Sequence, residues 1–205
     1  YGYQARKACE ALGPTYIKFG QMIGSSPGLF PKVVSEEFLN CLDNAPVFAF
    51  DEVELTMTEA FGKEWRLNYK TFEEEPIASA SIAQVHRAVM LDDSQVVVKI
   101  QRRGIKHIIE QDIGILFALA KFLVTRFKAA KLANPVGFVS DLNTTLHEEM
   151  NFILEANSMD KFNAVFSTCE NHEVRAPRVN RKLTSEKVLT MEYLDGFRAD
   201  AAEDI

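Results

Sequence analysis

The fold is decided by the stretch Ala78-Ser79-Ala80-Ser81-Ile82-Ala83-Gln84-Val85, together with Val96-Val97-Val98-Lys99 further along the chain. These stretches overlap two β-rich runs, Ala83 to Met90 and Gln95 to Gln101, which Asp92-Asp93-Ser94 separates. Two such runs joined by turn residues predict a β-hairpin. A turn of small residues therefore leads into one strand, and Lys99 lies on the next.

The spacing of the small residues matches a phosphate-binding arrangement. Nucleotide loops of protein kinases follow the pattern G-x-G-x-x-G-x-V, and the strand V-A-I-K supplies a phosphate-binding lysine. Here alanine occupies every glycine position, at Ala78, Ala80 and Ala83, with Val85 and then Lys99 in step. Small residues let the backbone approach phosphates, while alanine excludes the positive-φ conformations that glycine allows. We therefore expect a stiffer loop over the phosphates.

Each half of this pattern has a structural alternative, a small-residue turn or a solvated lysine, and only their combination favours phosphate binding. A lysine in this role needs a helix carboxylate as its partner. The candidates are Glu148, Glu149 and Glu155. At about 100° per residue, Glu148, Asn151 and Glu155 share one helical stripe, from which Glu149 is displaced. Periodicity therefore favours Glu155, against the alternative that each glutamate is an exposed helix charge.

Helices are predicted before the hairpin. Leu12, Tyr16, Phe19 and Ile23 repeat as one apolar stripe, and residues 24–31 then break the helix. A short helix follows over residues 33–42. Another is expected to start at Asp51 as N-cap, with Glu54 three residues later and Phe50 and Leu55 as a hydrophobic staple.

Two long helices and two strands are predicted after the hairpin. The helices cover residues 105–131 and, behind the cap signal Asn134-Pro135, residues 136–166. The strands cover residues 174–179 and 187–193. The apolar run Ile113 to Val124 contains Lys121 and is shorter than the roughly 20 residues that span a bilayer, which favours a buried helix.

Composition excludes several classes of protein. The chain has 205 residues, 47% of them hydrophobic, which is enough to bury a core. Its net charge of −6 offers nothing in bulk that would attract nucleic acid or an acidic membrane. Cys9, Cys41 and Cys169 are too far apart for a redox or metal motif and favour a reducing, cytoplasm-like compartment. His147-Glu148 resembles a zinc-protease helix, but Asn151 replaces the second histidine, so no metal site is predicted.

One polar pair near the start has no function on physical grounds alone. Lys18 and Gln21 lie three residues apart, on the side opposite the apolar stripe. Helical periodicity therefore indicates a solvated polar face.

Four ordered motifs give the chain its resemblance to a family. Lys18-Phe19-Gly20-Gln21 matches the K-x-G-Q signature of the UbiB family, the aarF-domain or Abc/Coq-eight-like atypical kinases. The family also has an alanine-rich loop, a strand lysine matched by Lys99, and an E-x-D motif followed by a helix glutamate, matched by Glu149-Met150-Asn151 and Glu155. Residues 188–196 match its hinge. The sequence therefore resembles this family over almost its whole length.

The resemblance implies a fold and a division into domains. The fold is α+β: a protein-kinase-like amino-terminal lobe with a small antiparallel sheet, inserted long helices and a helical amino-terminal extension. Residues 1–62 would form the extension that carries K-x-G-Q, residues 63–198 the lobe, and residues 199–205 the start of a carboxy-terminal lobe. Both ends of the chain are expected to be cut.

The resemblance also implies roles for single residues. Lys99 would bind the α- and β-phosphates of ATP or ADP, Glu155 would hold Lys99, and Lys18 would be inserted near Glu149, with Gln21 packed towards the lobe. The phosphates would be covered by Ala78, Ser79, Ala80, Ser81, Ile82, Ala83 and Val85. Backbone groups near Met191, Glu192 and Tyr193 would accept the adenine. Magnesium ligands are expected outside this sequence.

Two departures limit what these residues can do. First, Asn151 replaces the aspartate of E-x-D. Second, the H-x-D catalytic loop and the D-F-G aspartate do not occur in the 205 residues. The stretch Asp195-Gly196-Phe197 is not a D-F-G motif, because it directly follows the hinge. These residues alone should bind nucleotide weakly, if at all, and hydrolyse none.

The resemblance implies that the parent protein is an ATP-dependent kinase or ATPase, a phosphotransferase of quinone or lipid metabolism. Quinone-pathway enzymes, lipid, a peripheral membrane contact and self-association of this fragment are the expected partners. The alternative is a pseudokinase-like scaffold that binds lipid or a partner without catalysis.

Overall fold

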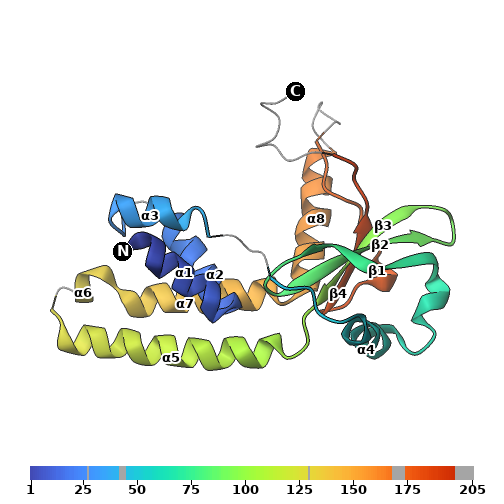
Figure 1. Cartoon of the computed structure of the whole chain (residues 1–205). Helices are drawn as coiled ribbons and strands as arrows, with labels where there is room; N and C mark the ends of the chain where they lie inside the picture. Colours follow the sequence, from blue (N-terminus) through green and yellow to red (C-terminus); the bar gives the residue numbers. More distant parts are fainter. Residues whose placement is uncertain (27, 42–44, 129, 168–173, 197–205) are drawn as a thin grey trace.

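The computed structural model of the chain describes residues 1–26, 28–41, 45–128, 130–167 and 174–196. A four-stranded antiparallel sheet has the strand order β1-β2-β3-β4. Helices flank the sheet and continue away from it (Figure 1). The predicted α+β class, with a small antiparallel sheet and long inserted helices, is confirmed.

The hairpin at the centre of the sheet has the predicted bounds. Strand β2 is Ala83–Met90 and strand β3 is Gln95–Gln101. The turn between them places Asp93 at a φ of 66°, and the Asp92 carboxylate accepts a hydrogen bond from the Ser94 amide. Strand β1, Tyr69–Ser79, pairs with β2 on the other side, so the alanine-rich stretch joins β1 to β2.

One face of the sheet is covered by helix α4, Phe50–Phe61, which follows an extended segment and precedes the short 3-10 helix η1, Trp65–Asn68. The core between them contains Val53, Met57, Trp65, Tyr69, Val96, Val98 and Ile100. The predicted cap is wrong: Ala49 precedes the helix without a side-chain cap, and Leu55 is exposed. Asp51 instead lies in the first turn, where a carboxylate favours the helix dipole.

Buried polar contacts join β2 to the segment before α4. The Gln84 side chain accepts from the Phe48 amide and contacts His86 Nε2 at 2.9 Å. His86 Nδ1 lies 2.9 Å from the Glu73 carbonyl of β1. Burial lowers the pKa of His86 and thus favours the neutral imidazole, in which Nδ1 donates to the Glu73 carbonyl.

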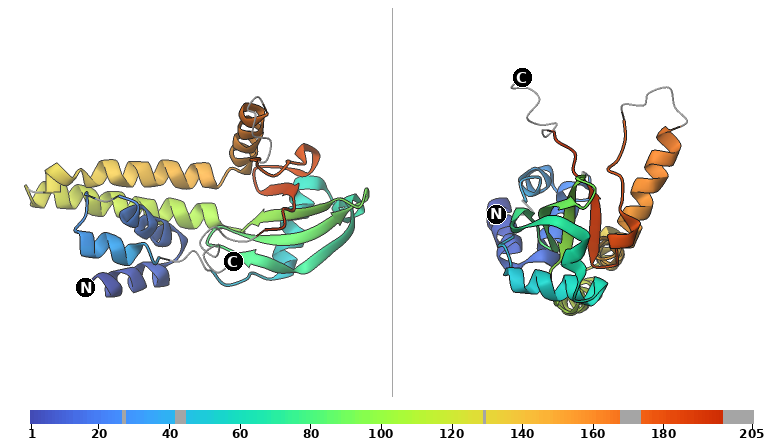
Figure 2. Two further views of the ribbon diagram at one scale, coloured as in Figure 1. Left: turned by 90° about the horizontal axis from the view of Figure 1, so that it is seen from above. Right: turned by 90° about the vertical axis from the view of Figure 1, so that its right-hand side faces the viewer.

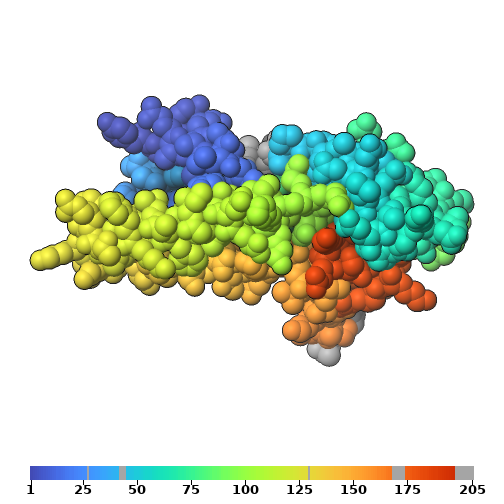
Figure 3. Space-filling view, turned by 90° about the horizontal axis from the view of Figure 1, so that it is seen from below, coloured from blue at the N-terminus to red at the C-terminus, as the bar shows by residue number. Residues whose placement is uncertain are grey.

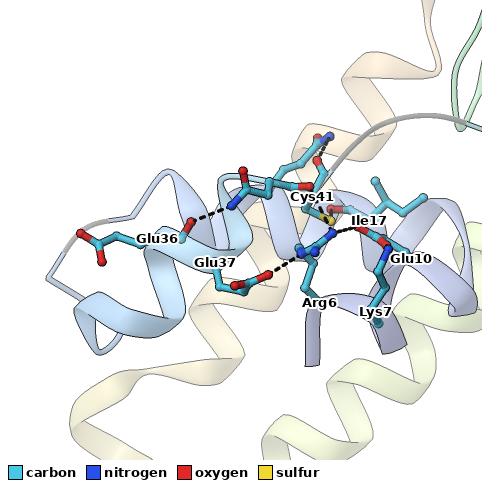
Figure 4. Close-up of polar contacts among 9 residues, drawn as sticks. Arg6, Lys7, Glu10, Ile17, Glu36, Glu37 and Cys41 are labelled. Atoms are coloured by element: carbon cyan, nitrogen blue, oxygen red, sulfur yellow. Dashed lines mark hydrogen bonds and ion pairs between the residues drawn. The ribbon is translucent and has the colours of Figure 1, made fainter. Parts of the chain in front are cut away.

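Three helices precede α4 in the chain: α1, Gly2–Leu12, α2, Pro14–Gly24, and α3, Lys32–Phe38. A single stripe running from Leu12 is wrong, because Gly13 at a φ of 105° and Pro14 divide the helix and leave Leu12 exposed. Arg6 of α1 contacts Glu10 at 2.5 Å and Glu37 of α3 at 2.7 Å (Figure 4). This ion-pair group joins the first and third helices.

Gly20, within the K-x-G-Q motif, lets α2 and α3 approach each other closely. A Cβ at this position would lie 2.8 Å from the buried ring of Phe38 and 3.1 Å from Cys41 Sγ. We therefore expect Gly20→Val to lower the free energy of unfolding by about 1–3 kcal/mol, the usual range for overpacking. Chemical denaturation measures the change.

Gly114 provides the matched control for this substitution. It lies in a helix and nothing lies within 4 Å of its Cβ position. Gly114→Ala should raise stability by about 0.5–1 kcal/mol through helix propensity. Equal changes in the free energy of unfolding for the two substitutions would show that the close packing of Gly20 against Phe38 does not affect stability.

Two long helices lie side by side and project away from the sheet (Figures 1 and 2). They are α5, Ile105–Arg126, and α7, Pro135–Glu149, with the short helix α6, Ala130–Ala133, between them. The predicted second helix over residues 136–166 is wrong in one respect, because it is divided at Met150 and Asn151. The remaining part is α8, Phe152–Phe166, which packs against β4.

The described residues that follow α8, 174–196, contain one strand instead of the predicted two. Strand β4, Val188–Glu192, pairs with β3 and follows the 3-10 helix η2, Arg181–Leu183. Residues 174–179 form no strand, and only Val179 makes an isolated bridge, to Met191. Residues 199–205, predicted to begin another lobe, lie outside the described residues.

Candidate nucleotide cleft

A cleft of about 740 Å³ lies where the β1–β2 turn, strand β3 and the junction of α7 with α8 meet. Charged side chains of both signs line it: Lys18, Lys99, Lys161, Glu148, Glu149 and Glu155. Ala80, Ile82 and Ala83 of the alanine-rich stretch form an apolar wall of the cleft. Residues that are far apart in the sequence therefore meet at one site.

The lysine of strand β3 contacts the helix glutamate, as the sequence predicts. Lys99 Nζ lies 2.8 Å from Glu155 Oε2, and both side chains are partly buried. The ammonium also lies 4.8 Å from the centre of the Phe152 ring, which is fully buried. A carboxylate and an aromatic face thus hold the Lys99 ammonium in one place.

The division between α7 and α8 explains why Glu155 can reach Lys99. The Asn151 side chain accepts from the Ile153 amide and caps α8, while the Gln101 side chain donates to the Met150 carbonyl at 2.7 Å. These contacts fix the junction to β3. The predicted stripe of Glu148, Asn151 and Glu155 is therefore wrong, because no continuous helix carries all three.

Asn151 stands at the aspartate position of the E-x-D motif, but it does not line the cleft. It caps a helix and lines a separate pocket, which is also lined by residues at the α5 amino terminus. Asparagine and aspartate are both good N-caps. The loss of a carboxylate at this position therefore leaves the local helix start intact.

Lys18 of the extension contacts Glu149 at the end of α7, across the cleft from the Lys99–Glu155 pair. The side chains of Lys18 and Glu149 are 24% and 37% exposed, so the lysine is not on a fully solvated face. The contact predicted from the resemblance is confirmed, and the solvated-face alternative is wrong for Lys18. Packing of α2 on α5 and α7 brings the ammonium there.

Gln21 differs from Lys18. Its amide nitrogen lies 3.5 Å from the carbonyl of Cys41, within the extension, and the side chain is partly buried. This contact lies within the amino-terminal helices, and the packing of Gln21 towards the nucleotide lobe stays a prediction.

The alanine-rich stretch is anchored at both its ends and its tip. The Ala80 amide donates to the Ala83 carbonyl at 2.8 Å and closes the turn. Ile82 is buried in the core beneath α5, α7 and α8, and its carbonyl accepts from the Arg102 amide at 2.8 Å. Ser81 is also buried, whereas Ala78 is exposed and Ser79 and Val85 are partly exposed. The turn is thus part of the folded core.

The strand end that was predicted to accept adenine already uses two backbone donors. The Glu192 amide donates to the Arg178 carbonyl at 2.8 Å, and the Tyr193 amide donates to the Gln95 carbonyl at 3.0 Å. The Arg175 guanidinium bonds the Glu192 carboxylate and lowers the pKa of Glu192. Adenine recognition at Met191, Glu192 and Tyr193 would therefore have to use carbonyl groups.

Sequence reasoning missed several residues of the cleft. Thr145, Leu154, Asn157, Ser158 and Lys161 line it from α7 and α8. Nothing in the helix pattern separates these residues from ordinary surface positions. Phe152 beneath Lys99 was also missed, although its position directly after a capping asparagine places it in the first turn of α8.

The sheet, the turn and the Lys99–Glu155 pair define the class of protein as kinase-like. The ABC1 atypical kinase-like domain matches residues 40–205. The chain belongs to this family. The K-x-G-Q residues precede the matched range. The similarity of the amino-terminal helices to the family therefore comes from the relatives, whose alignments cover almost the whole chain.

The relatives align over almost the whole chain. An uncharacterized protein of Mycobacterium tuberculosis is 43% identical over 195 residues, which is 95% of this chain and 40% of that protein. An uncharacterized chloroplastic aarF domain-containing protein kinase of Arabidopsis thaliana is 37% identical and covers 93% of this chain and 36% of its own length. A probable protein kinase UbiB of Cellvibrio japonicus is 34% identical, with 96% and 35% covered.

A solved structure has the same fold. The Mycobacterium tuberculosis protein Rv3197, in complex with erythromycin, superposes with a TM-score of 0.60 at 25% identity, covering 87% of this chain and 43% of that chain. The chain thus spans 35–43% of the length of these four proteins. Among its described helices, none combines the length and the apolar character that crossing a membrane requires.

Proposed function

We propose that the cleft binds the phosphates of an adenine nucleotide, ATP or ADP, with Lys99 as the principal ligand. The observation that carries the proposal is the Lys99–Glu155 contact of 2.8 Å beneath the alanine-rich turn. A lysine held by a helix carboxylate keeps its ammonium at the α- and β-phosphates in kinase-like sites. Glu155 would act by positioning Lys99.

The contact between Lys18 and Glu149 brings the amino-terminal extension into the proposed nucleotide site. Their contact joins α2 to the end of α7 at the cleft, and Lys18 lines the same cavity as Lys99. A second ammonium would attract the outer phosphate oxygens, and Glu149 would hold it when phosphate is absent. The extension, residues 1–62, would then belong functionally to the lobe, residues 63–198. Gln21, with its carbonyl contact at Cys41, would support only the extension.

A nucleotide normally brings Mg²⁺ to a kinase-like site, where it neutralises charge on the phosphates. The described residues contain no group of three or more His, Cys, Asp or Glu side chains that could hold a metal ion. Within the described residues, we assign phosphate binding to the lysines and backbone groups of the cleft. For the parent protein we propose an ATP-dependent phosphotransferase or ATPase supporting quinone or lipid metabolism, as the family resemblance implies; one relative is named a probable protein kinase UbiB.

A nucleotide-ordered scaffold without catalysis is the second candidate. One observation favours it: both Lys18 and Lys99 already contact carboxylates, so the cleft is electrostatically satisfied without ligand. Nucleotide turnover by the parent protein would favour the enzyme, whereas tight binding without turnover would favour the scaffold.

A thermal-unfolding titration tests nucleotide binding. ADP and ATP should raise the unfolding temperature with increasing concentration, because a ligand that binds only the folded state stabilises it. Inorganic phosphate and the nucleoside adenosine, each alone, should give smaller shifts. The proposal would be wrong if saturating nucleotide shifted the midpoint no more than phosphate at equal ionic strength.

A further inference from the structure

A second pocket lies outside the nucleotide cleft, where strand β3 ends and helix α5 begins. It has a volume of about 650 Å³ and is lined by residues of α4, the β3–α5 turn, the α7–α8 junction and the segment before β4. In Figure 3, α4 (cyan), the start of α5 (green) and the segment before β4 (orange-red) meet on the face in view. No described residue lines both this pocket and the nucleotide cleft. The volume is that of a small-molecule site.

The floor of this pocket consists of buried residues that hydrogen bonds join together. Thr56, Gln101, Ile105 and Met150 are at most 9% exposed. The Gln101 side chain donates to the Met150 carbonyl at 2.7 Å, and the Gln101 amide donates to the Lys187 carbonyl at 2.9 Å. These bonds connect β3, the α7–α8 junction and the segment before β4. The pocket is therefore formed by the fold itself, before any ligand binds.

The rim of the pocket is cationic, although the whole chain has a net charge of −6. Arg103 and Lys187 share one carboxylate, that of Glu59, at 2.7 Å and 3.6 Å. Lys106 forms no ion pair with any described residue. Positive charge therefore remains at the rim for an anion. Four cations and two carboxylates line the pocket: Arg102, Arg103, Lys106 and Lys187, with Glu110 and Glu186.

Hydrogen-bond acceptors line the same pocket. Gln101 Oε1 accepts no hydrogen bond from the described residues, although Gln101 is only 7% exposed. His147 Nδ1 lies 2.8 Å from the Asn143 carbonyl and donates to it, which leaves Nε2 of the neutral ring as an acceptor. Together with the two carboxylates, these groups accept hydrogen bonds from hydroxyl groups. A ligand that satisfies the whole pocket therefore carries both an anion and hydrogen-bond donors.

We propose that this pocket binds a small phosphorylated polyol, of the class of sugar phosphates. The phosphate would lie against the cations of the rim, with Lys106 as its principal ligand, because lysine and arginine form strong charge-assisted bonds to phosphate. The hydroxyl groups would donate to Gln101 Oε1, to His147 Nε2 and to the two carboxylates. The inference does not depend on the proposed nucleotide site, since the two pockets share no described residue.

A nucleotide or a bare inorganic ion fits the pocket less well. Pockets for drug-like ligands are usually walled by apolar and aromatic side chains. Here Ile105 and Met150 are the large apolar side chains among the lining residues, and no phenylalanine, tyrosine or tryptophan lines the pocket. A base would therefore lack a stacking surface. An inorganic phosphate would leave the acceptors and most of the 650 Å³ unused.

Titration calorimetry of the purified chain tests the proposal with three probes: glucose 6-phosphate, ribose 5-phosphate and glycerol 3-phosphate. At least one should bind about tenfold or more tightly than inorganic phosphate and than its own unphosphorylated polyol, because each of these engages only part of the pocket. Lys106→Gln with Lys187→Gln should weaken binding of that probe about 10- to 100-fold, through the loss of charged donors. The matched control, Lys63→Gln with Lys182→Gln, removes two exposed lysines that do not line the pocket and should change binding little.

A second pair of variants separates a selective site from general attraction of anions. Glu110→Ala with Glu186→Ala should raise the affinity for inorganic phosphate, because repulsion decreases. The preference for the sugar phosphate over inorganic phosphate should fall about threefold or more, because its hydroxyl groups lose acceptors. The control, Glu36→Ala with Glu64→Ala, removes two exposed glutamates elsewhere and should change neither affinity. Circular dichroism verifies that all variants are folded.

Four results would overturn the proposal. They are sugar phosphates that bind no more tightly than inorganic phosphate, an equal loss in the lysine control, an unchanged preference in Glu110→Ala with Glu186→Ala, and loss of sugar-phosphate binding in Lys99→Met. The last result would place the ligand in the nucleotide cleft, which Lys99 lines. Because these titrations contain no nucleotide, a failure of the proposed nucleotide site would leave their outcome unaffected.

Discussion

Lys99→Met should weaken binding of ADP and ATP about 10- to 100-fold, the effect of removing a hydrogen bond from a charged donor. The substitution leaves an unbranched apolar side chain of similar size, but it removes the ammonium that contacts Glu155 and lies over the Phe152 ring. Titration calorimetry or a fluorescent nucleotide measures the affinity.

Lys70→Met is the control for Lys99→Met. Lys70 lies at the other end of the sheet, where its ammonium is 2.5 Å from Asp93 in an exposed ion pair. Its removal should leave nucleotide affinity unchanged and stability within about 1 kcal/mol, because exposed ion pairs contribute little. An equal loss in both variants would show that general charge, and not the cleft, attracts the nucleotide.

Phe152→Ala should lower the free energy of unfolding by about 3–5 kcal/mol, the usual cost of truncating a buried aromatic residue. Phe152 is fully buried between the sheet and the long helices, and its amide donates to the Glu186 carbonyl. Chemical denaturation measures the loss.

Phe162→Ala on the same helix is the control for Phe152→Ala. Phe162 is 39% exposed and stacks on Phe166, with ring centres 4.3 Å apart. It should cost far less than Phe152→Ala. If both substitutions cost the same, α8 is not held to the lobe through its first turn, and the geometry of Glu155 needs another explanation.

The central part of the fold could be predicted from the sequence because its signals are local. Turn residues fixed both ends of the β2–β3 hairpin, and Asn134-Pro135 fixed the start of α7. The break between α7 and α8 could not be predicted. The pattern of apolar residues continues across it, and the contacts that stabilise the break come from Gln101 and Glu186, which lie far away in the sequence.

The site could be predicted only in part, because some of its signals are local and others depend on tertiary packing. Lys99 and Glu155 follow from a spacing and a charge requirement, and Lys18 follows from the family resemblance alone. Helical periodicity gave Lys18 a solvated position, because a helical pattern cannot show that α2 lies against α5 and α7. Residues 174–179 were misassigned as a strand, since the isolated bridge of Val179 to Met191 depends on tertiary packing.

The central claim is that Lys99 and Glu155 act together as one phosphate-binding unit, and a double-mutant cycle on nucleotide affinity tests it most directly. Glu155→Gln alone should weaken binding of ADP, because Lys99 then loses the carboxylate 2.8 Å away that holds it. In the Lys99→Met background the same substitution should change the affinity no further. Additive losses, or an affinity that Glu155→Gln leaves unchanged, would contradict the account.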